Sequence, residues 1–147
     1  MAETVRKAIT EVLEADAQLV ALVDDYVDEN GTNLGAAIFH RTAPQDAAVP
    51  FVLLHKQSGM PRYAIGGDGR YEDELWTIKA VDRGLSATQA EEIDERIRLA
   101  LHDAPLDVDG YETLWCRREQ DIDYGEVEEG TLIHHIGAMY RVLREPT

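Results

Sequence analysis

Three kinds of residue are scarce in this chain of 147 residues: cysteine, aromatic residues and positively charged residues. The single cysteine, Cys116, excludes a disulfide within the chain and fits a reducing compartment. Aromatic residues make up 7% of the sequence, which is few for the aromatic-lined cleft of a glycoside hydrolase. The chain has 14 Lys and Arg residues and 29 Asp and Glu residues, so the formal net charge is −15. This charge disfavours independent binding to DNA, RNA or an anionic membrane, although solubility alone also explains it.

Long apolar runs and enzyme motifs are also missing. No apolar stretch approaches ~18 residues and no charged-then-apolar leader opens the chain, so we expect neither a membrane span nor secretion. The sequence contains no Walker loop, dinucleotide-binding fingerprint, GxSxG or HExxH motif. The glycines of AIGGDGR, at 64–70, lack a following Lys-Ser or Lys-Thr and predict a flexible hairpin loop rather than a phosphate-binding loop. We therefore do not expect an enzyme.

Candidate metal ligands are present but poorly placed. His134 and His135 are adjacent in a predicted strand, where neighbouring side chains point to opposite faces and cannot easily share one ion. The carboxylates of 119–129 do not have the spacing of an EF-hand, and Gly125 falls outside that pattern. We expect neither a metal nor a cofactor.

Two segments have helical periodicity. In residues 3–23 apolar positions recur at helical spacing, and Asp16 interrupts them as a residue that can cap a second helix, so the pattern fits one helix or two. Residues 87–102 form the clearest predicted helix, with Ser86 as its N-cap and Gln89 completing a capping box. The core face of this helix consists of Ala90, Ile93, Ile97 and Leu101.

The remaining periodic segments predict the strands of a sheet. They are 36–40, 49–57, 71–81, 111–118 and 131–144. The segments 24–37 and 58–70 are rich in turn-forming residues and predict connections. This order indicates a two-layer α+β fold, in which an antiparallel sheet of about four to five strands packs against two or three helices. Neither a repeat nor a linker divides the sequence, so residues 1–147 are expected to form a single domain.

The strand predicted at 131–144 is apolar on both faces. One face carries Leu132, His134, Ile136, Ala138, Tyr140 and Val142. The other face carries Ile133, His135, Gly137, Met139, Arg141 and Leu143. A small domain normally turns one face of its sheet to water, so a second apolar face calls for a cover. We expect another subunit to supply it through Met139, Arg141, Leu143 and a strand edge; the alternative is a central strand covered on both sides within one chain.

An acidic segment precedes this strand and is predicted to be a hairpin loop. Residues 119–129 read EQDIDYGEVEE and contain no Lys or Arg. The carboxylates of the segment are Glu119, Asp121, Asp123, Glu126, Glu128 and Glu129. Burying these carboxylates without ion-pair partners would cost too much free energy. We therefore expect the loop to stay hydrated and not to be needed for the fold.

Four segments carry a resemblance to a known family. The first is the helix with EADAQLVALV at 14–23, and the second is IFHRTAPQDAAVPFVLLHKQSG at 38–59. The third is LWTIKAVDRGLSATQAEEIDERIRLAL at 75–101, and the last is the closing strand with MYRVLRE at 139–145. Their residues and order resemble the tail-completion or tail-terminator family of long-tailed bacteriophages. One departure is the acidic segment 24–35, because family members commonly pass from the first helix almost directly into the first strand.

The resemblance implies a structural role in the virion. A member of this family caps the head-proximal end of the tail tube, fixes tail length and joins the tail to the head. It implies a homo-oligomeric ring, usually a hexamer, with the tail tube protein and the head–tail connector protein as partners, no cofactor and no membrane. Such a ring is assembled in the host bacterial cytoplasm and resides in the virion tail. In the ring, the acidic loop is expected to face the channel, where it would keep DNA phosphates off the wall, or to lie at the rim.

Other functions fit parts of the same sequence. A head–tail connector or neck subunit belongs to the same class of phage proteins. An acidic host binding module, with a small-molecule pocket between sheet and helices, is the main alternative from another class, and a small enzyme comes third. Ring formation without small-molecule stabilisation favours the tail protein, whereas a ligand-dependent rise in Tm favours the binding module.

We predict negligible binding of the purified protein to duplex DNA at physiological salt. The net charge of −15 repels phosphates, and among the 14 basic residues the only adjacent pairs are Arg6–Lys7 and Arg117–Arg118. A gel-shift assay should show no complex at micromolar protein. A micromolar affinity with a steep salt dependence would contradict this prediction.

Overall fold

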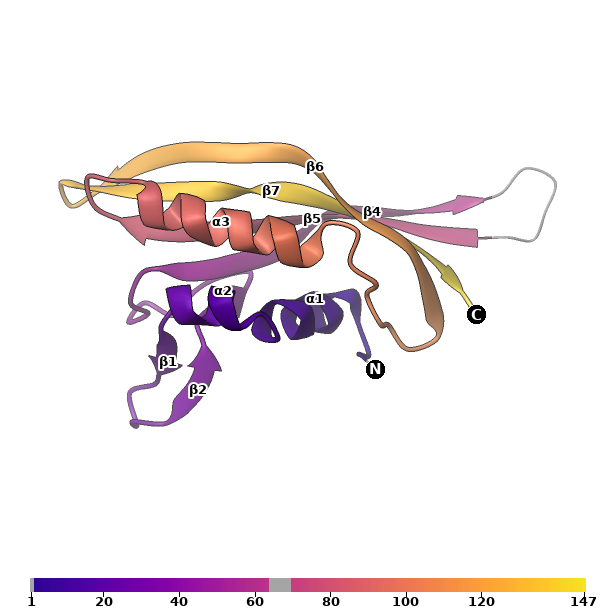
Figure 1. Ribbon diagram of the computed structural model, residues 1–147, viewed down its shortest axis with the longest axis horizontal. Coiled ribbons are helices and arrows are strands. Elements are labelled where there is room, and N and C mark those ends of the chain that lie inside the picture. Colours follow the sequence, from indigo (N-terminus) through magenta and orange to yellow (C-terminus); the bar gives the residue numbers. More distant parts are fainter. Residues whose placement is uncertain (1, 64–69) are drawn as a thin grey trace.

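The fold is a long twisted sheet with helices along one side (Figure 1). The computed structural model describes residues 2–63 and 70–147. The helices are α1 (Val5–Glu14), α2 (Ala17–Leu22) and α3 (Thr88–Leu101). The strands are β1 (Asp25–Val27), β2 (Asn33–Ala36), β3 (Ile38–His40), β4 (Phe51–Tyr63), β5 (Arg70–Arg83), β6 (Tyr111–Glu128) and β7 (Thr131–Pro146). No helix in this described part of the chain has the length and apolar character needed to cross a membrane.

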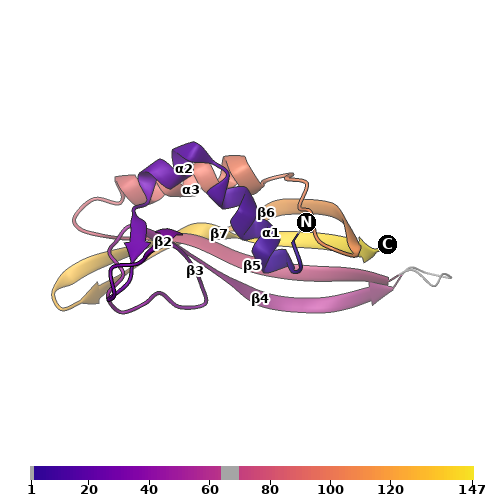
Figure 2. The same ribbon diagram turned by 90° about the horizontal axis from the view of Figure 1, so that it is seen from below.

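The main sheet, as far as the described residues show it, has five strands in the order β3-β4-β5-β7-β6. β3 pairs with β4 in parallel, and all other neighbours in this sheet are antiparallel. β1 and β2 form a separate antiparallel pair. The helices lie on one face of the main sheet (Figure 2). The predicted two-layer α+β fold is confirmed, but the sheet is mixed rather than wholly antiparallel, because β3, which lies within the strand predicted at 36–40, pairs with β4 in parallel.

Asp16 divides the first helical segment in two. Its carboxylate accepts hydrogen bonds from the backbone N–H groups of Gln18 and Leu19, each at 3.0 Å, and so caps α2. Its other oxygen accepts a hydrogen bond from Arg96 Nη2 of α3 at 2.9 Å. The sequence pattern fitted either one helix or two, and the structure has two.

The clearest predicted helix is confirmed as α3, but its predicted cap is wrong. The N-cap position is Ala87, one residue after Ser86, and it makes no side-chain capping bond. Ser86 Oγ accepts a hydrogen bond from the backbone N–H of Thr88 at 3.2 Å. Gln89 does not complete a capping box, because its Nε2 donates to Leu22 O at 3.4 Å. This contact ties the start of α3 to the end of α2.

Two predicted connections are largely strand. The segment 24–37 contains β1 and β2, because its turn residues are needed only at the tip of a hairpin. There the Asp28 carboxylate accepts hydrogen bonds from the backbone N–H groups of Asn30 and Thr32. The segment 58–70 contains the end of β4 and the start of β5. The glycine-containing loop predicted within it lies outside the described residues, apart from its last residue.

The acidic segment 119–129 is also strand rather than loop. It continues β6, which pairs with β7 as far as Glu128 opposite Thr131. Glu129 and Gly130, with φ of 51° and 77°, form the two-residue turn between the strands. The acidic composition indicated a loop, but β6 is the last strand of the sheet and its outer side is open, so its carboxylates stay in water while the backbone pairs with β7.

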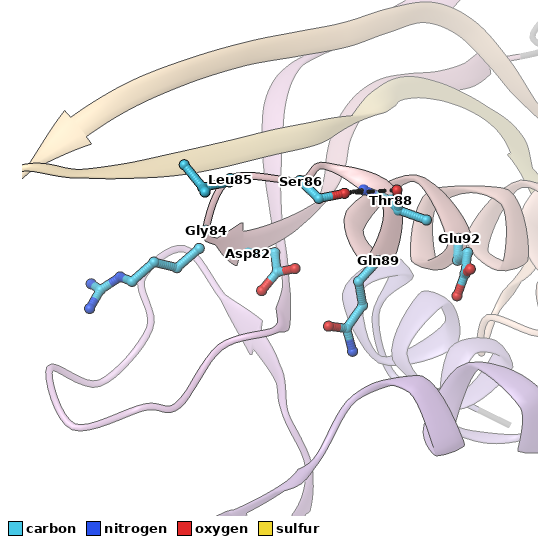
Figure 3. Close-up of a pocket in the computed structure, with 8 residues that line it drawn as sticks. Asp82, Gly84, Leu85, Ser86, Thr88, Gln89 and Glu92 are labelled. Atoms are coloured by element: carbon cyan, nitrogen blue, oxygen red, sulfur yellow. Dashed lines mark hydrogen bonds between the residues drawn. The ribbon is translucent and has the colours of Figure 1, made fainter.

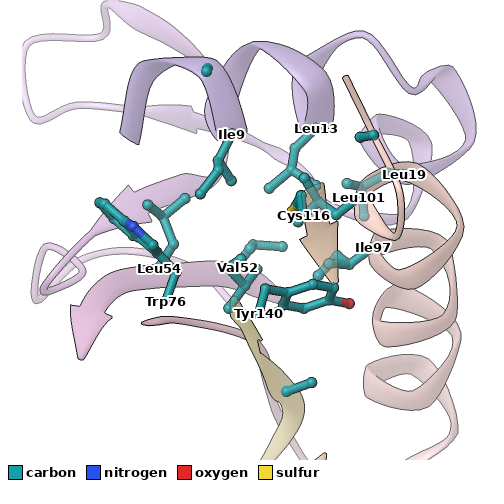
Figure 4. Packing of buried hydrophobic residues seen from close by; sticks show 14 of the residues in the cluster. Ile9, Leu13, Leu19, Val52, Leu54, Trp76, Ile97, Leu101, Cys116 and Tyr140 are labelled. Atoms are coloured by element: carbon teal, nitrogen blue, oxygen red, sulfur yellow. The ribbon is translucent and has the colours of Figure 1, made fainter. Parts of the chain in front are cut away.

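Buried apolar side chains from the helices and the sheet form the hydrophobic core (Figure 4). The helices contribute Ile9, Leu13, Leu19, Ile97 and Leu101, among others. β7 contributes Ile136, Ala138, Tyr140 and Val142, the face expected to meet the core. Cys116 is fully buried beside them, and this burial raises the pKa of its thiol to about 12. The cysteine is therefore a small core residue, as its place in an apolar strand predicted.

A largely buried ion pair joins α3 to β6. Arg118 donates from Nη1 and Nη2 to the two carboxylate oxygens of Asp94, at 2.8 and 3.0 Å. Its Nη1 also donates to the Tyr140 hydroxyl at 3.3 Å. Burial raises the pKa of Tyr140 to about 12, although the neighbouring Arg118 acts to lower it. This pair could not be predicted from sequence patterns, because its members lie in separate elements.

We predict that Gly137→Ala destabilises the protein by about 3 kcal/mol, because strand β5 lies very close to this position. A Cβ at residue 137 would lie 2.3 Å from Ile78 O and 2.4 Å from Lys79 Cα, and neither backbone atom can move aside cheaply. Urea denaturation measures the change in the free energy of unfolding.

The control is Gly125→Ala on β6. Its Cβ would first meet the flexible side chain of Leu132, whose Cδ1 lies 3.1 Å away, so the change should stay below about 1 kcal/mol. Equal effects of the two substitutions would contradict the steric argument.

Candidate assembly surface

The candidate functional site is the face of the main sheet that is turned away from the helices, named here the open face. Alternation along β4, β5 and β7 places on it Leu53, Leu75, Thr77, Lys79, Val81, Ile133, His135, Met139, Arg141 and Leu143. In residues 2–63 and 70–147, no helix packs against this face (Figure 2). Thr77, Val81, Ile133 and His135 on this face are nonetheless buried within the chain, so its cover by another subunit stays a prediction.

Met139 and Leu143, two of the predicted contact residues, are half-buried by their neighbours on the open face. Met139 lies opposite Thr77, and Leu143 lies opposite Asp73 of β5 and Trp115 of β6. Their apolar surface is only partly shielded, and burying the rest against another surface would be favourable.

An ion-pair network crosses one end of the open face. Asp73 of β5 is 4% exposed and accepts hydrogen bonds from Arg141 Nη1 of β7 at 2.6 Å and from Arg62 Nε of β4 at 2.5 Å. Arg141 also donates from Nε and Nη2 to Glu119 of β6, at 2.5 and 2.9 Å. The network therefore links four neighbouring strands through side chains.

The same contacts fix the charges of these groups. Burial acts to raise the pKa of Asp73, but the hydrogen bonds from Arg141 and Arg62 outweigh it, so this pKa lies below its ordinary value. The hydrogen bond from Arg141 lowers the pKa of Glu119, and the bonds to Glu119 and Asp73 raise the pKa of Arg141. Arg141, predicted to contact another subunit, is thus held by carboxylates of its own chain.

The other end of the open face carries a polar cluster. The rings of Tyr124 and His135 are stacked, with centroids 4.5 Å apart and planes 9° from parallel. His135 Nε2 lies 2.6 Å from Glu126 Oε1, and Lys79 Nζ donates to the Tyr124 hydroxyl at 2.8 Å. These contacts join β6 to β7 and to β5, so the open face is polar at both ends and more apolar between them.

The two adjacent histidines have separate partners. His134 Nε2 lies 2.9 Å from Gly84 O, whereas His135 is engaged by Glu126. Across the described residues, no three His, Cys, Asp or Glu side chains lie close enough together to hold a metal ion.

All carboxylates of the acidic segment 119–129 are exposed. Within the segment, Glu119 pairs with Arg141, Asp121 with Arg118, and Glu126 with His135. Asp123, Glu128 and Glu129 form no ion pair within the described part of the chain. These three pairs could not be predicted from the composition of the acidic segment, because every partner lies outside it, on β7 or immediately before the segment in β6.

A hollow of about 610 Å³ lies where β5 ends and α3 begins (Figure 3). It is lined by Asp82, Leu85, Ser86, Gln89 and Glu92, among others. The Ser86 hydroxyl is hydrogen-bonded to the first residue of α3 rather than to a base. Among the described residues that line this hollow, Ser86 is therefore not arranged as an activated nucleophile.

Comparison with known proteins finds the same fold in a solved structure and a family in the sequence. A solved chain described as "Virion of native gene transfer agent (GTA) particle" superimposes with a TM-score of 0.70 at 20% sequence identity, over 95% of this chain and 93% of that chain. The family model described as "Tail completion protein gp17" matches residues 7–141. The chain therefore belongs to this tail completion family. A comparison with curated proteins finds no match.

Membership of this family gives the protein a structural role in a phage tail and places it in the tail of the virion. The resemblance drawn from four segments of the sequence is confirmed, because the matched range includes the first three and part of the fourth. The family is one of structural tail proteins rather than of enzymes.

We predict that Asp73→Asn lowers stability at neutral pH and weakens its dependence on acid. At pH 7 the loss should be about 2–3 kcal/mol, the size of hydrogen bonds to a charged group. Because the pKa of Asp73 is lowered in the folded protein, its stabilisation is complete above the ordinary aspartate pKa and is lost as the pH falls through the lowered value. Urea denaturation from pH 7 down to pH 3 should show a smaller acid-induced loss in the variant than in the wild type.

Asp123→Asn is the matched control, because it removes an exposed carboxylate without an ion pair in the described residues. It should change the free energy of unfolding by less than about 0.5 kcal/mol. An Asp73→Asn variant with the acid dependence of the wild type would show that the network does not depend on Asp73.

Proposed function

We propose that this protein closes the head-proximal end of the tail tube as a ring of identical subunits, fixes tail length and joins the tail to the head connector. The observation that carries the proposal is the open face of the sheet, which is half-apolar and uncovered in a member of a tail completion family. The sequence resemblance supports six subunits in the ring.

The open face supplies the contact between subunits in this proposal. Met139 lies opposite Thr77 and diagonal to Leu75, in the more apolar part of the face, whereas Leu143 lies opposite Asp73, at the end that carries the ion-pair network. Arg141 contributes indirectly, since its bonds to Asp73 and Glu119 hold the three strands in register around those apolar residues. β6 is poorly suited to extend a sheet, because irregularities in its pairing and exposed carboxylates blunt its outer edge. The contact we propose is therefore made mainly by the face.

A tube grows because each subunit layer presents the same surface to the next one, and growth ends when an unlike surface covers the end. A ring of this protein would be such a cover, with one side complementary to the tube and the other to the head connector. We place the exposed carboxylates Glu119, Asp121 and Asp123 at a hydrated surface of the ring, either its channel or its rim. In the channel their charge would let DNA pass without binding.

We predict that loss of the gene leaves tail tubes that exceed their proper length or fail to join heads, together with full heads that lack tails. Electron microscopy of the lysate measures both outcomes. Tubes of normal length that fail to attach would support the joining role alone, which is that of a neck subunit, and would contradict the control of tail length. Infectious particles with normal tails would contradict the proposed function.

Complementation of the deletion tests the open face itself. Met139→Asp with Leu143→Asp should fail to restore normal tails, because it places two charges in the proposed contact. Leu99→Asp is the control, since Leu99 is exposed on α3 and lies on the other side of the sheet. Restoration by both variants would show that subunits do not meet through the open face.

A further inference from the structure

A positively charged cleft lies on the helix side of the sheet, beside the start of α1. Its volume is about 450 Å³. Its cations are Arg6, Arg41, Lys56 and Arg144, which come from four distant parts of the chain. The carboxylates that line it are Glu3 and Glu74, and Glu3 is paired with Lys7 at 2.8 Å. The cleft is therefore locally positive in a chain whose net charge is −15.

The charges inside this cleft are not balanced. Glu74 is 6% exposed and is shared by Lys56 Nζ at 3.2 Å and Arg144 Nη2 at 3.3 Å. Arg6 and Arg41 form no ion pair with any residue in the described ranges 2–63 and 70–147. Glu74 is thus shared by two cations, whereas Arg6 and Arg41 have no carboxylate partner among the described residues.

Buried donors in the cleft also lack acceptors. Trp76 is 4% exposed, and its Nε1 has no hydrogen-bond partner among the described residues; the same holds for Nε of Arg144. A buried N–H group left unsatisfied costs about 1–3 kcal/mol. The positive field is also felt by His40, whose pKa is lowered by burial and by Arg6 and Arg41. The cleft is therefore suited to an anionic acceptor such as a carboxylate.

Carboxylates of the required kind lie at the far end of the molecule. Glu128 and Glu129 form the tip of the β6–β7 hairpin, and neither has an ion pair in the described part of the chain. Val127, next to them, is 72% exposed. From Thr131 at the tip to Arg144 at the cleft, β7 spans about 40 Å (Figure 1). The tip therefore cannot reach the cleft of its own chain.

We propose that the hairpin tip of one subunit, residues 127–129, docks into this cleft in a second copy of the chain. The tip carboxylates would neutralise Arg6 and Arg41, the two cations of the cleft that have no ion pair in the described residues. This contact joins two different surfaces and leaves one of each free, so it repeats from subunit to subunit, and the rotation between neighbours that the proposed ring requires closes the series. The inference rests on the proposed ring and adds the contact that orients neighbouring subunits.

Charge reversal tests the contact by analytical ultracentrifugation of the purified chain. The tip variant, Glu128→Arg with Glu129→Arg, and the cleft variant, Arg6→Glu with Arg41→Glu, should each raise the dissociation constant of the ring by about tenfold or more. A mixture of the two variants should assemble again, because every tip then finds a cleft of opposite charge in an alternating ring. Glu128→Gln with Glu129→Gln keeps the shape of the tip and should weaken the ring in the same direction.

The control is Glu11→Arg with Glu14→Arg, which changes the net charge as much as the tip variant does but on the exposed side of α1. It should leave assembly unchanged, and melting curves should confirm that all variants are folded. Rings that persist in both the tip and cleft variants would overturn the docking and leave the ring proposal standing. A wild type that stays monomeric at high concentration would overturn both.

A cleft variant that forms rings but fails to join tubes or heads would assign the cleft to another tail protein. DNA binding that disappears in the cleft variant would assign it to nucleic acid. Either result would overturn the docking of a second copy.

Discussion

Burial of one face of the sheet against α1, α2 and α3 is the interaction on which the rest of the structure depends. The helices are short relative to the strands that they cover. α3, with 14 residues, is about 21 Å long, whereas β6, with 18 residues, extends to about 60 Å. The helices therefore bury the middle of one face, and the strands run past them. This mismatch lets the β6–β7 hairpin project beyond the core, and because the described helices all lie on one face, none covers the open face.

Three of the scarce cations each tie two elements of the structure together. Arg96 ties α3 to the cap of α2, Arg118 ties α3 to β6, and Arg141 ties β7 to its two neighbours. Each pair is at least partly shielded from water, where charge-assisted hydrogen bonds contribute more than they do on an exposed surface. In an acidic chain these ties offset part of the repulsion among carboxylates. Arg6 and Arg41 are different, because neither forms such a tie in the described residues.

Sequence periodicity predicted the elements whose one face is buried. The alternation of β7 placed Tyr140 and Val142 in the core and Met139 and Leu143 on the opposite face, and the structure agrees. Apolar and polar residues alternate along any strand that buries one face, so this pattern can be recognised without knowing the partner strands.

Composition was a poorer guide than alternation in β6. Asp121 and Asp123 alternate there with Ile122 and Tyr124, but the density of carboxylates indicated a loop. An edge strand can carry such residues because its backbone pairs on one side while its side chains remain in water. The ion pairs and the cleft could not be predicted at all. Asp73 and Arg141 are 68 positions apart, and only the pairing of β5 with β7 brings them together.

The burial of Cys116 has a practical consequence for work on the assembled particle. Its thiol is enclosed in the core and has a pKa of about 12, so at neutral pH it is almost entirely protonated and inaccessible to alkylating reagents. The sequence contains no other cysteine. A cysteine introduced anywhere on the surface would therefore be the single site that a maleimide dye or gold cluster modifies, without first removing the native one. Because the native cysteine does not react, each surface of the subunit can be labelled separately and located within a tail.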